Sequence, residues 1–309
     1  MIITNPAEIN NCYRAIALGN FDGIHQGHQV VLQPVLHRAS ASLTKAVVSF
    51  DPHPREFFTQ QPLALLTPKV EKADYLEKLG FDELILIPFD ARLAALSPTQ
   101  FVEEILIQQL QARLISVGAD FRFGKARKGT ATELKSIASY YGIEVEINSL
   151  HKYRDSNGNK VRVSSSLVRQ ALVTGDIPQA NAMLGREYTL KGKVVTGKQI
   201  GRTIGFPTAN LEVPQNKFLP RFGVYAVRAL YQEQSILGVM NIGCRPTVAG
   251  EAPTIEVHLL DWSGDLYNQE LTVSIEAFLR PEQKFDSLEE LKTQIKQDCE
   301  RALHLTLSI

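Results

Sequence analysis

Residues 15–28 read Ala-Ile-Ala-Leu-Gly-Asn-Phe-Asp-Gly-Ile-His-Gln-Gly-His and join an apolar run to a glycine-rich turn that contains two histidines. The run at 15–18 predicts a buried parallel strand, and the sequence from residue 29 onward predicts a helix. Such a turn lets backbone approach a phosphate closely, and the helix N-terminus offers N–H groups and the positive end of its dipole. The segment therefore predicts a nucleotide-handling enzyme.

Further strand-like runs follow along the first 150 residues, separated by amphipathic stretches long enough to be crossover helices. They lie at 46–50, 83–87, 114–117 and 143–147. This alternation predicts a doubly wound α/β domain, with an open parallel sheet and helices on both faces. Ligands of such folds collect beyond the carboxyl ends of the strands, where the loops 20–28, 51–54 and 118–129 all fall. We therefore expect these three loops to form one site.

The pattern changes after Asp176, and we place a domain boundary near Leu184, which gives domains 1–183 and 184–309. Alternating runs at 189–195, 224–231, 235–242, 254–260 and 271–278 predict antiparallel strands, and their spacing is typical of a small closed barrel. The segment from Ser287 to Ile309 has apolar residues at helical spacing, with Ser287 as N-cap and Glu290 three residues later. We expect this helix to pack on the barrel.

Composition excludes several classes of protein. The 309 residues are 44% hydrophobic, and Lys+Arg and Asp+Glu both number 33, so no global basic field points to a nucleic-acid partner. The cysteines, Cys12, Cys244 and Cys299, are odd in number and far apart, which argues against a disulfide framework and favours a reducing cytoplasm. No run is long enough for a membrane span, and the first residues do not resemble a secretion signal.

The chemistry of the first site centres on His25 and His28, one in the turn and one at the helix start. Attack on the α-phosphate of ATP builds negative charge on its oxygens, which imidazole N–H groups and helix-end amides stabilise. The alternatives are a zinc pair or two surface histidines. Zinc needs three or four ligands, and His53 is the only obvious third ligand nearby, so we do not expect zinc.

Three other segments add polar groups to the expected site. Asp51-Pro-His-Pro presents Asp51 and His53 from a stiff loop, and a rigid turn without a ligand explains it equally well. The loop 122–129 holds four cations between glycines, which suits phosphate binding, although a solvated charge run is the common alternative. In 164–169, Ser-Ser-Ser-Leu-Val-Arg, a serine caps a helix that we expect to begin near Leu167, with Arg169 in its first turn. Capping alone would explain these serines.

Together these motifs resemble the prokaryotic bifunctional riboflavin kinase/FMN adenylyltransferases, also called FAD synthetases. The resemblance rests on residues 18–28, on Ser49-Phe-Asp-Pro-His-Pro, on 118–129 and on 164–169, in this order. It implies a Rossmann-like nucleotidyltransferase domain that converts FMN and ATP into FAD and pyrophosphate. The FMN phosphate is already an anion, so this step needs no strong general base.

The resemblance also implies roles for individual residues. His25 and His28 would stabilise the α-phosphate, while Ser164, Ser165 and Arg169 hold the departing phosphates. The remaining predicted nucleotide-binding residues are Gly19, Phe21, Asp22 and Gly23, and the predicted flavin-binding residues of this domain are Asp51, His53, Arg122 and Arg127.

A second site is expected in 197–211, where glycines precede Pro-Thr-Ala-Asn. Thr208 and Asn210 alternate in an extended segment, so their oxygens face one side and suit a hard cation such as Mg²⁺. Without further support, a glycine-rich loop entering an edge strand would be the preferred interpretation. The segment resembles the Pro-Thr-Ala-Asn motif of riboflavin kinases, and more of that pattern follows at 223–225, 238–243, 245–247, 256–261, 266–268 and 279–285.

Phosphorylation of riboflavin requires a base, because the ribityl hydroxyl must lose a proton. By resemblance this base is Glu256, although an exposed strand glutamate in a salt bridge is the simpler alternative. Resemblance further implies that Arg280 lies near the flavin or the nucleotide, and that the ATP phosphates are wrapped by Gly201, Arg202 and Gly205. Asn268 replaces a glycine that many relatives have, and asparagine tolerates a left-handed conformation.

The resemblance therefore implies a bifunctional enzyme that makes FMN in the C-terminal domain and FAD in the N-terminal domain. Its substrates would be riboflavin, FMN and ATP, its metal Mg²⁺, and its state a cytoplasmic monomer or weak homo-oligomer without nucleic-acid or membrane partners. Two alternatives remain open: one of the two domains is catalytically weak, or the chain is a flavin- or nucleotide-binding regulator. The presence of Glu256 and both histidines argues against a regulator.

Overall fold

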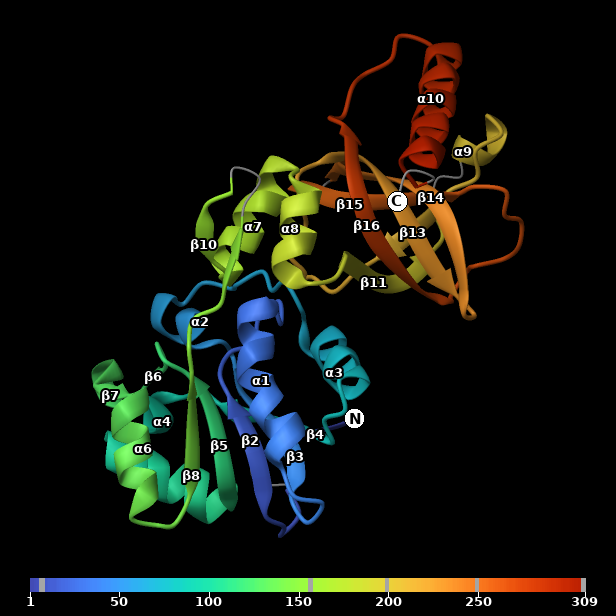
Figure 1. The fold of residues 1–309 in the computed structure, drawn as a ribbon. Coiled ribbons are helices and arrows are strands. Elements are labelled where there is room, and N and C mark those ends of the chain that lie inside the picture. The colour runs from blue at the N-terminus through green and yellow to red at the C-terminus, as the bar shows by residue number, and fades with distance from the viewer. Residues whose placement is uncertain (6–8, 155–157, 198–199, 248–249, 307–309) are drawn as a thin grey trace. The chain divides into compact units, whose positions relative to one another are not determined.

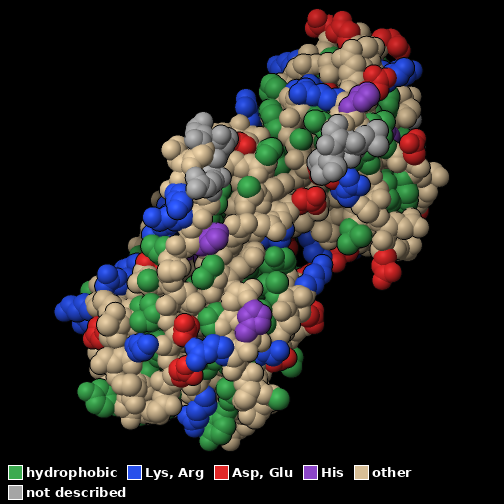
Figure 2. Space-filling view, viewed as in Figure 1, with side chains coloured by type: hydrophobic (Ala, Val, Ile, Leu, Met, Phe, Trp, Pro, Cys, Tyr) green, Lys and Arg blue, Asp and Glu red, His purple; other side chains and the backbone are tan. Residues whose placement is uncertain are grey.

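The computed structural model describes residues 1–5, 9–154, 158–197, 200–247 and 250–306. It divides the chain into two compact units, Met1–Ser165 and Ser166–Ile309. Figure 1 shows a sheet with helices in the first unit and a barrel in the second. In the face shown in Figure 2, acidic and basic side chains are present on both units. The domain boundary at 183/184 stays a prediction.

The first unit is built on a six-stranded sheet whose neighbouring strands are all parallel. Its spatial order is β1 (Ile2–Thr4), β4 (Glu83–Pro88), β3 (Thr44–Asp51), β2 (Arg14–Leu18), β5 (Ala112–Gly118) and β8 (Glu144–Asn148). The predicted open parallel sheet is confirmed. Five of the six strands coincide with the apolar runs, and β1 was not predicted.

Helices cover both faces of this sheet, because alternate residues of each strand face opposite sides. In β2, Ala15 and Ala17 belong to one apolar cluster and Ile16 and Leu18 to another. The first cluster contains residues of α1 (Gln26–Arg38) and α3 (Lys69–Lys78), and the second residues of α4 (Ala91–Ala95), η1 (Phe101–Gln109) and α6 (Ala131–Ser139). The unit also contains α2 (Pro54–Thr59), α5 (Pro98–Gln100), β6 (Arg122–Phe123), η2 (Lys125–Arg127), β7 (Gly129–Thr130), β9 (Lys152–Arg154) and β10 (Lys160–Arg162).

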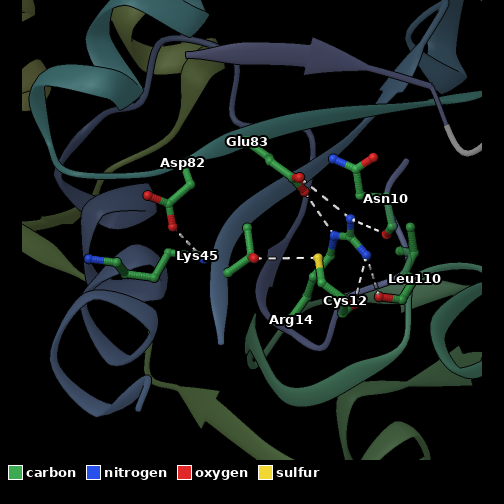
Figure 3. A network of polar contacts seen from close by, with 8 residues as sticks. Asn10, Cys12, Arg14, Lys45, Asp82, Glu83 and Leu110 are labelled. Carbon is green, nitrogen blue, oxygen red and sulfur yellow. Dashed lines mark hydrogen bonds and ion pairs between the residues drawn. The ribbon is translucent and has the colours of Figure 1, made fainter. Parts of the chain in front are cut away.

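The amino end of β2 is fixed by the buried guanidinium of Arg14 (Figure 3). Its Nε donates to Glu83 Oε2 at 2.8 Å, and its Nη atoms donate to the carbonyl oxygens of Asn10 and Cys12 at 3.0 Å and of Leu110 at 3.4 Å. These contacts join β2, β4 and the segment before β5. The ion pair therefore holds together the amino ends of these strands, at the edge of the sheet opposite the predicted site.

The strand order reverses between β2 and β5. From β2 the chain proceeds outward to β3 and β4, and it then returns to place β5 on the other side of β2. Ligands of open α/β sheets bind at such a switch point, outside the carboxyl ends of the strands. The turn after β2 and the loop after β5 both leave the sheet here.

The second unit is a closed antiparallel barrel, as predicted, with the order β11-β12-β15-β14-β13-β16. Its strands are β11 (Tyr188–Val195), β12 (Ala209–Glu212), β13 (Gly223–Tyr231), β14 (Gln234–Thr247), β15 (Gly250–Leu259) and β16 (Glu270–Arg280). The helices α7 (Ser165–Thr174) and α8 (Ile177–Leu184) precede it, and α9 (Ile200–Thr203) lies between β11 and β12. Gln232 and Glu233 have positive φ in the turn that joins β13 to β14, as a tight two-residue hairpin requires.

The final helix, α10 (Leu288–Thr306), packs on this barrel as predicted. The amide of Glu290 donates to Ser287 Oγ at 3.2 Å, which confirms the predicted cap. Cys299 and Ala302 join an apolar cluster with Val224 of β13 and Leu279 of β16. Among the described residues, no helix combines the length and the apolar character that crossing a bilayer requires.

Candidate active sites

The first candidate site is the turn between β2 and α1, whose backbone is unusual. Phe21 and Ile24 have φ values of 49° and 41°, a region that non-glycine residues rarely adopt, and Gly23 has 89°. All three are buried, and Phe21 packs against Gly19. Strained backbone persists only where its surroundings hold it, and it concentrates at functional sites. The conformation directs the chain tightly from the strand into the helix.

His25 and His28 are in direct contact at the start of α1. His25 is the N-cap, and its Nδ1 accepts from the amide of His28 at 3.2 Å. The two rings stack with centroids 3.7 Å apart and an interplanar angle of 11°. Gly27 allows this packing, because a Cβ there would lie 3.2 Å from two atoms of the His25 ring. Since Nδ1 is an acceptor, a neutral His25 has its proton on Nε2, a donor suited to a phosphate oxygen.

Neighbouring segments hold the turn between these elements. Thr67 accepts from the amide of Gly23 at 2.9 Å, and its own amide donates to Asp22 Oδ1 at 3.2 Å. Ser165 Oγ donates to the carbonyl of Asp22 at 2.8 Å. The helix α7 (Ser165–Thr174) begins at Ser165, two residues before the predicted start near Leu167. The Ser165 hydroxyl bonds the turn itself, because its helix starts early enough to bring it there.

The Asp51-Pro-His-Pro segment follows β3 and opens α2. His53 Nδ1 accepts from the amide of Arg55 at 3.1 Å, and Glu56 accepts from the amide of His53 at 3.0 Å. His53 is thus a reciprocal cap, which matches the rigid-turn interpretation of the segment. Asp51 is exposed at the carboxyl end of β3.

The loop after β5 contains four basic residues, and all of them are exposed: Arg122, Lys125, Arg127 and Lys128. Arg122 lies in β6, which pairs with β7 and so closes the loop at its base. Ala126 and Arg127 both have φ of 56°. The loop therefore presents several cations on a defined backbone turn.

The second candidate site is a row of polar residues across three strands of the barrel. Asn210 of β12 and Asn241 of β14 both pair in register with Glu256 of β15. Paired residues of antiparallel strands face the same side of a sheet. Ile255 and Val257 are buried and Glu256 is half-buried between them, so the row lies on the outer face of the barrel. Thr254 and His258 share this face by alternation.

The segment before β12 is folded against this row. Phe206 donates its amide to Gly201 O at 2.8 Å, and His258 Nδ1 contacts Pro207 O at 2.8 Å. Asn210 leaves no room for a side chain at Gly197, since a Cβ there would lie 2.2 Å from its Nδ2. Gly205 has φ of 89°. Thr208, Asn210 and Glu256 together offer hydroxyl, amide and carboxylate oxygens, the donors that Mg²⁺ prefers.

The described residues contain no group of three or more His, Cys, Asp and Glu side chains arranged to hold a metal ion. The side chain of Arg202 and residues 198–199 of the glycine-rich segment lie outside what the structure describes.

Comparison with known proteins identifies the family. The FAD synthetase family model matches residues 7–167, and the riboflavin kinase model matches residues 184–306. The Escherichia coli K12 bifunctional riboflavin kinase/FMN adenylyltransferase is 41% identical over 286 residues, which are 92% of this chain and 90% of that protein. This chain belongs to the bifunctional riboflavin kinase/FMN adenylyltransferase family. The Bacillus subtilis member is 36% identical and covers 97% of this chain and 96% of its own length.

A solved structure has a fold similar to that of this riboflavin kinase/FMN adenylyltransferase family member. A Streptococcus pneumoniae protein described as a macrolide-efflux protein has a TM-score of 0.84 and 31% identity. The match covers 97% of this chain and 98% of that one. The resemblance inferred from the motifs is therefore confirmed, and so is the two-part architecture.

In this family member, two predicted arginines have partners within the second unit. Arg280 is paired with Asp298 of α10, with contacts of 2.8 to 3.1 Å, and donates to Pro281 O at 3.1 Å. Arg169 lies on α7, with its guanidinium carbon 5.6 Å from the centre of the Phe218 ring. Their roles toward flavin and phosphate stay predictions.

Three residues around the two sites were not predicted. Thr67 and Lys72 hold the turn of the first unit, and Asn241 extends the polar row of the second. Asn241 lies in the quoted family segment 238–243, so its place in a motif was the available signal. Thr67 and Lys72 lie in or near an ordinary amphipathic helix, and no local pattern distinguishes them.

Proposed function

We propose that the second unit phosphorylates riboflavin to FMN and that the first unit adenylylates FMN to FAD, each with ATP. The observation that supports this most strongly is the presence of both family models, in this order, in one chain. The stacked histidines at the switch point and the outward row around Glu256 supply groups suited to the two reactions.

In the first reaction, an FMN phosphate oxygen attacks the α-phosphorus of ATP, and the bond to the β-phosphate oxygen breaks to release pyrophosphate. His25 and His28 donate to the α-phosphate oxygens as charge develops on them. The turn residues Gly19, Phe21, Asp22 and Gly23 bind the nucleotide. Ser164, Ser165 and Arg169 keep their predicted role toward the departing pyrophosphate, Ser165 also through its helix-start amide.

We assign flavin binding in this reaction to residues that follow the carboxyl ends of β3 and β5. Arg122 and Arg127 pair with the FMN phosphate, as exposed guanidinium groups do well. Asp51 and His53 orient the flavin from the rigid segment that opens α2. Positioning and charge stabilisation account for the rate, because the nucleophile needs no deprotonation.

In the second reaction, Glu256 accepts the proton of the ribityl hydroxyl, whose oxygen attacks the γ-phosphorus while ADP departs. Gly201, Arg202 and Gly205 wrap the phosphates, and Arg280 lies near flavin or nucleotide. Thr208 and Asn210 would hold Mg²⁺, which offsets phosphate charge when bound. Register pairing of Asn210 with Glu256 brings these oxygen donors to the base.

The test is to incubate the purified chain with riboflavin, ATP and Mg²⁺ and to separate the flavins over time. FMN should appear first and FAD later. His28→Ala should stop conversion at FMN, with FAD formation lowered about a hundredfold or more. Exposed His37 at the end of α1 gives the control, His37→Ala, which should leave both steps unchanged.

Glu256→Gln should lower FMN formation about a hundredfold or more, while added FMN still becomes FAD. Its control is Glu289→Gln, at an exposed position in the first turn of α10. Loss of both steps in a folded Glu256→Gln protein would refute the two-site assignment. A parental chain that makes neither product would refute the enzyme and favour a binding protein.

We further propose that the protein acts in the cytoplasm as a monomer or weak homo-oligomer, without nucleic acid. The balanced charge and the scattered cysteines support this. Light scattering during size-exclusion chromatography at enzyme concentrations tests the oligomeric state.

A further inference from the structure

Lys72 is a buried cation beneath the turn of the first site. It lies on α3, which packs on the same face of the sheet as α1, and only 7% of its surface is exposed. Its Nζ donates to the carbonyl of Asn20 at 2.8 Å and to Ser49 Oγ at 3.4 Å. Ser49 Oγ in turn donates to the same Asn20 carbonyl at 3.0 Å. One backbone oxygen at the end of β2 thus accepts from two buried side chains.

A lysine in this position is costly to bury. Desolvation lowers the pKa of Lys72, and the negative charges of Asp22 and Asp51 act in the opposite direction. The cost of removing an ammonium group from water offsets much of what its buried contacts contribute to stability. Stability alone therefore gives no reason for an ammonium group here.

The position of the group relative to the site gives a better reason. Asn20 is the first residue after Gly19 and opens the turn, and Asp22 belongs to the same turn. Thr67 binds Asp22 and Gly23, so the segment from Thr67 to Lys72 contacts the turn at both ends. A shift of Asn20 would be transmitted to His25 through Phe21 and Ile24, because both have constrained backbone.

We propose that Lys72 is a positioning residue for adenylyl transfer, fixing the Asn20 carbonyl so that the turn 20–28 keeps its phosphate-binding geometry. This rests on the proposed function of that turn. Lys72 acts through the backbone and not on the reacting atoms. Its charge also offsets the charges of Asp22 and Asp51 at the edge where anionic substrates arrive.

The experiment uses the full chain with Lys72→Met, Lys72→Arg and the control Lys78→Met, which changes an exposed lysine on the same helix. FAD formation from FMN and ATP, FMN formation from riboflavin, and thermal unfolding are measured for each. Methionine keeps much of the apolar stem and removes the charge and the donor.

We expect Lys72→Met to lower kcat for FAD formation about tenfold to a hundredfold, because small misplacements of catalytic groups have effects of this size. KM for ATP should change much less, thermal unfolding should stay close to that of the parent, and FMN formation should be unchanged. Lys72→Arg should recover part of the loss, since it restores a donor and a positive charge. Lys78→Met should behave as the parent.

A folded Lys72→Met protein that forms FAD at the parental kcat would overturn the proposal, and so would a loss that Lys72→Arg does not relieve at all. Should methionine prevent folding, Lys72→Gln takes its place, because it removes the positive charge and shortens the side chain that reaches Asn20. Parental FAD formation by a folded Lys72→Gln protein would then overturn the proposal. Failure of the proposed function is distinguishable, because His28→Ala would then retain FAD formation whatever Lys72 does.

Discussion

His25 accepts the backbone N–H of His28 through Nδ1 while the two imidazole rings stack at 3.7 Å. One side chain thus has two separable tasks, capping α1 through Nδ1 and offering a donor through Nε2. The cap stabilises the helix, whereas the donor is the group that we propose binds the phosphate. Substitutions that preserve one task and remove the other therefore test the assignment.

His25→Asn should keep the cap and lose the phosphate donor, since asparagine is among the best N-cap residues. We expect thermal stability near that of the parent together with a strong loss of FAD formation. His25→Ala should lose both, with about 1 kcal/mol less stability. Urea unfolding and FAD formation, measured on both variants, check this. Parental FAD formation by His25→Asn would show that the ring has only a structural task.

The buried pair of Arg14 and Glu83 predicts a purely structural effect at the far edge of the sheet. Glu83→Gln leaves the Arg14 guanidinium buried with its charge uncompensated, and we expect a loss of about 3–5 kcal/mol in the free energy of unfolding. The remaining folded protein should still form FAD with unchanged KM values. Urea unfolding of Glu83→Gln beside exposed Glu77→Gln measures the loss, and equal stabilities would contradict the prediction.

The sequence predicted most strands because buried parallel strands are continuous apolar runs, as in β3 and β5. It did not predict β1, which has three residues and, within the described part of the chain, pairs with β4 at one edge of the sheet. Arg14 was also left out of its strand, because a charged residue beside an apolar run normally marks the surface. Its burial depends on Glu83 and on carbonyls distant in sequence, which no local pattern encodes.

The residues of the candidate sites also differ in how far the sequence predicts them. His25 and His28 were predictable because spacing within one turn determines their contact. Lys69, Lys72 and Lys78 look alike in a helix, and only the tertiary fold distinguishes buried Lys72 from the other two. Likewise, the contact of Ser165 with Asp22 joins segments far apart in the chain. No local sequence pattern indicates which strands and loops, distant in the chain, come into contact.

Asn268 confirms one local expectation, since its φ of 63° is left-handed. Its amide also donates to Val194 O at 2.9 Å. Asn268→Gly should therefore leave stability almost unchanged, whereas Asn268→Val should lose about 1–2 kcal/mol because a branched side chain opposes this conformation. Thermal unfolding of the two variants measures the difference. Equal stability of the valine variant and the parent would contradict this account of the turn.

Cys299 gives a prediction about alkaline pH. Cys299 lies on the face of α10 that packs on the barrel, and this burial raises the pKa of its thiol from an ordinary value of 9.0 to about 11, helped by Asp298 and Glu300. Between pH 9.0 and about 11 the thiol loses its proton in the unfolded chain but keeps it in the folded protein, so ionisation of the thiol favours unfolding. The contribution of Cys299 to stability is therefore complete below pH 9.0 and decreases as pH rises toward about 11.

Cys299→Ala removes this titration and should make the alkaline loss of stability smaller than in the parent. Urea unfolding of both proteins at pH 9.0 and pH 11 provides the comparison. The raised pKa of Tyr225 acts in the same direction in both, so the difference between the proteins isolates the thiol. Cys12→Ala gives the control, because Cys12 is a half-buried thiol in the first unit, outside α10. Parallel pH dependences of parent and Cys299→Ala would show that the thiol does not titrate in the way its burial implies.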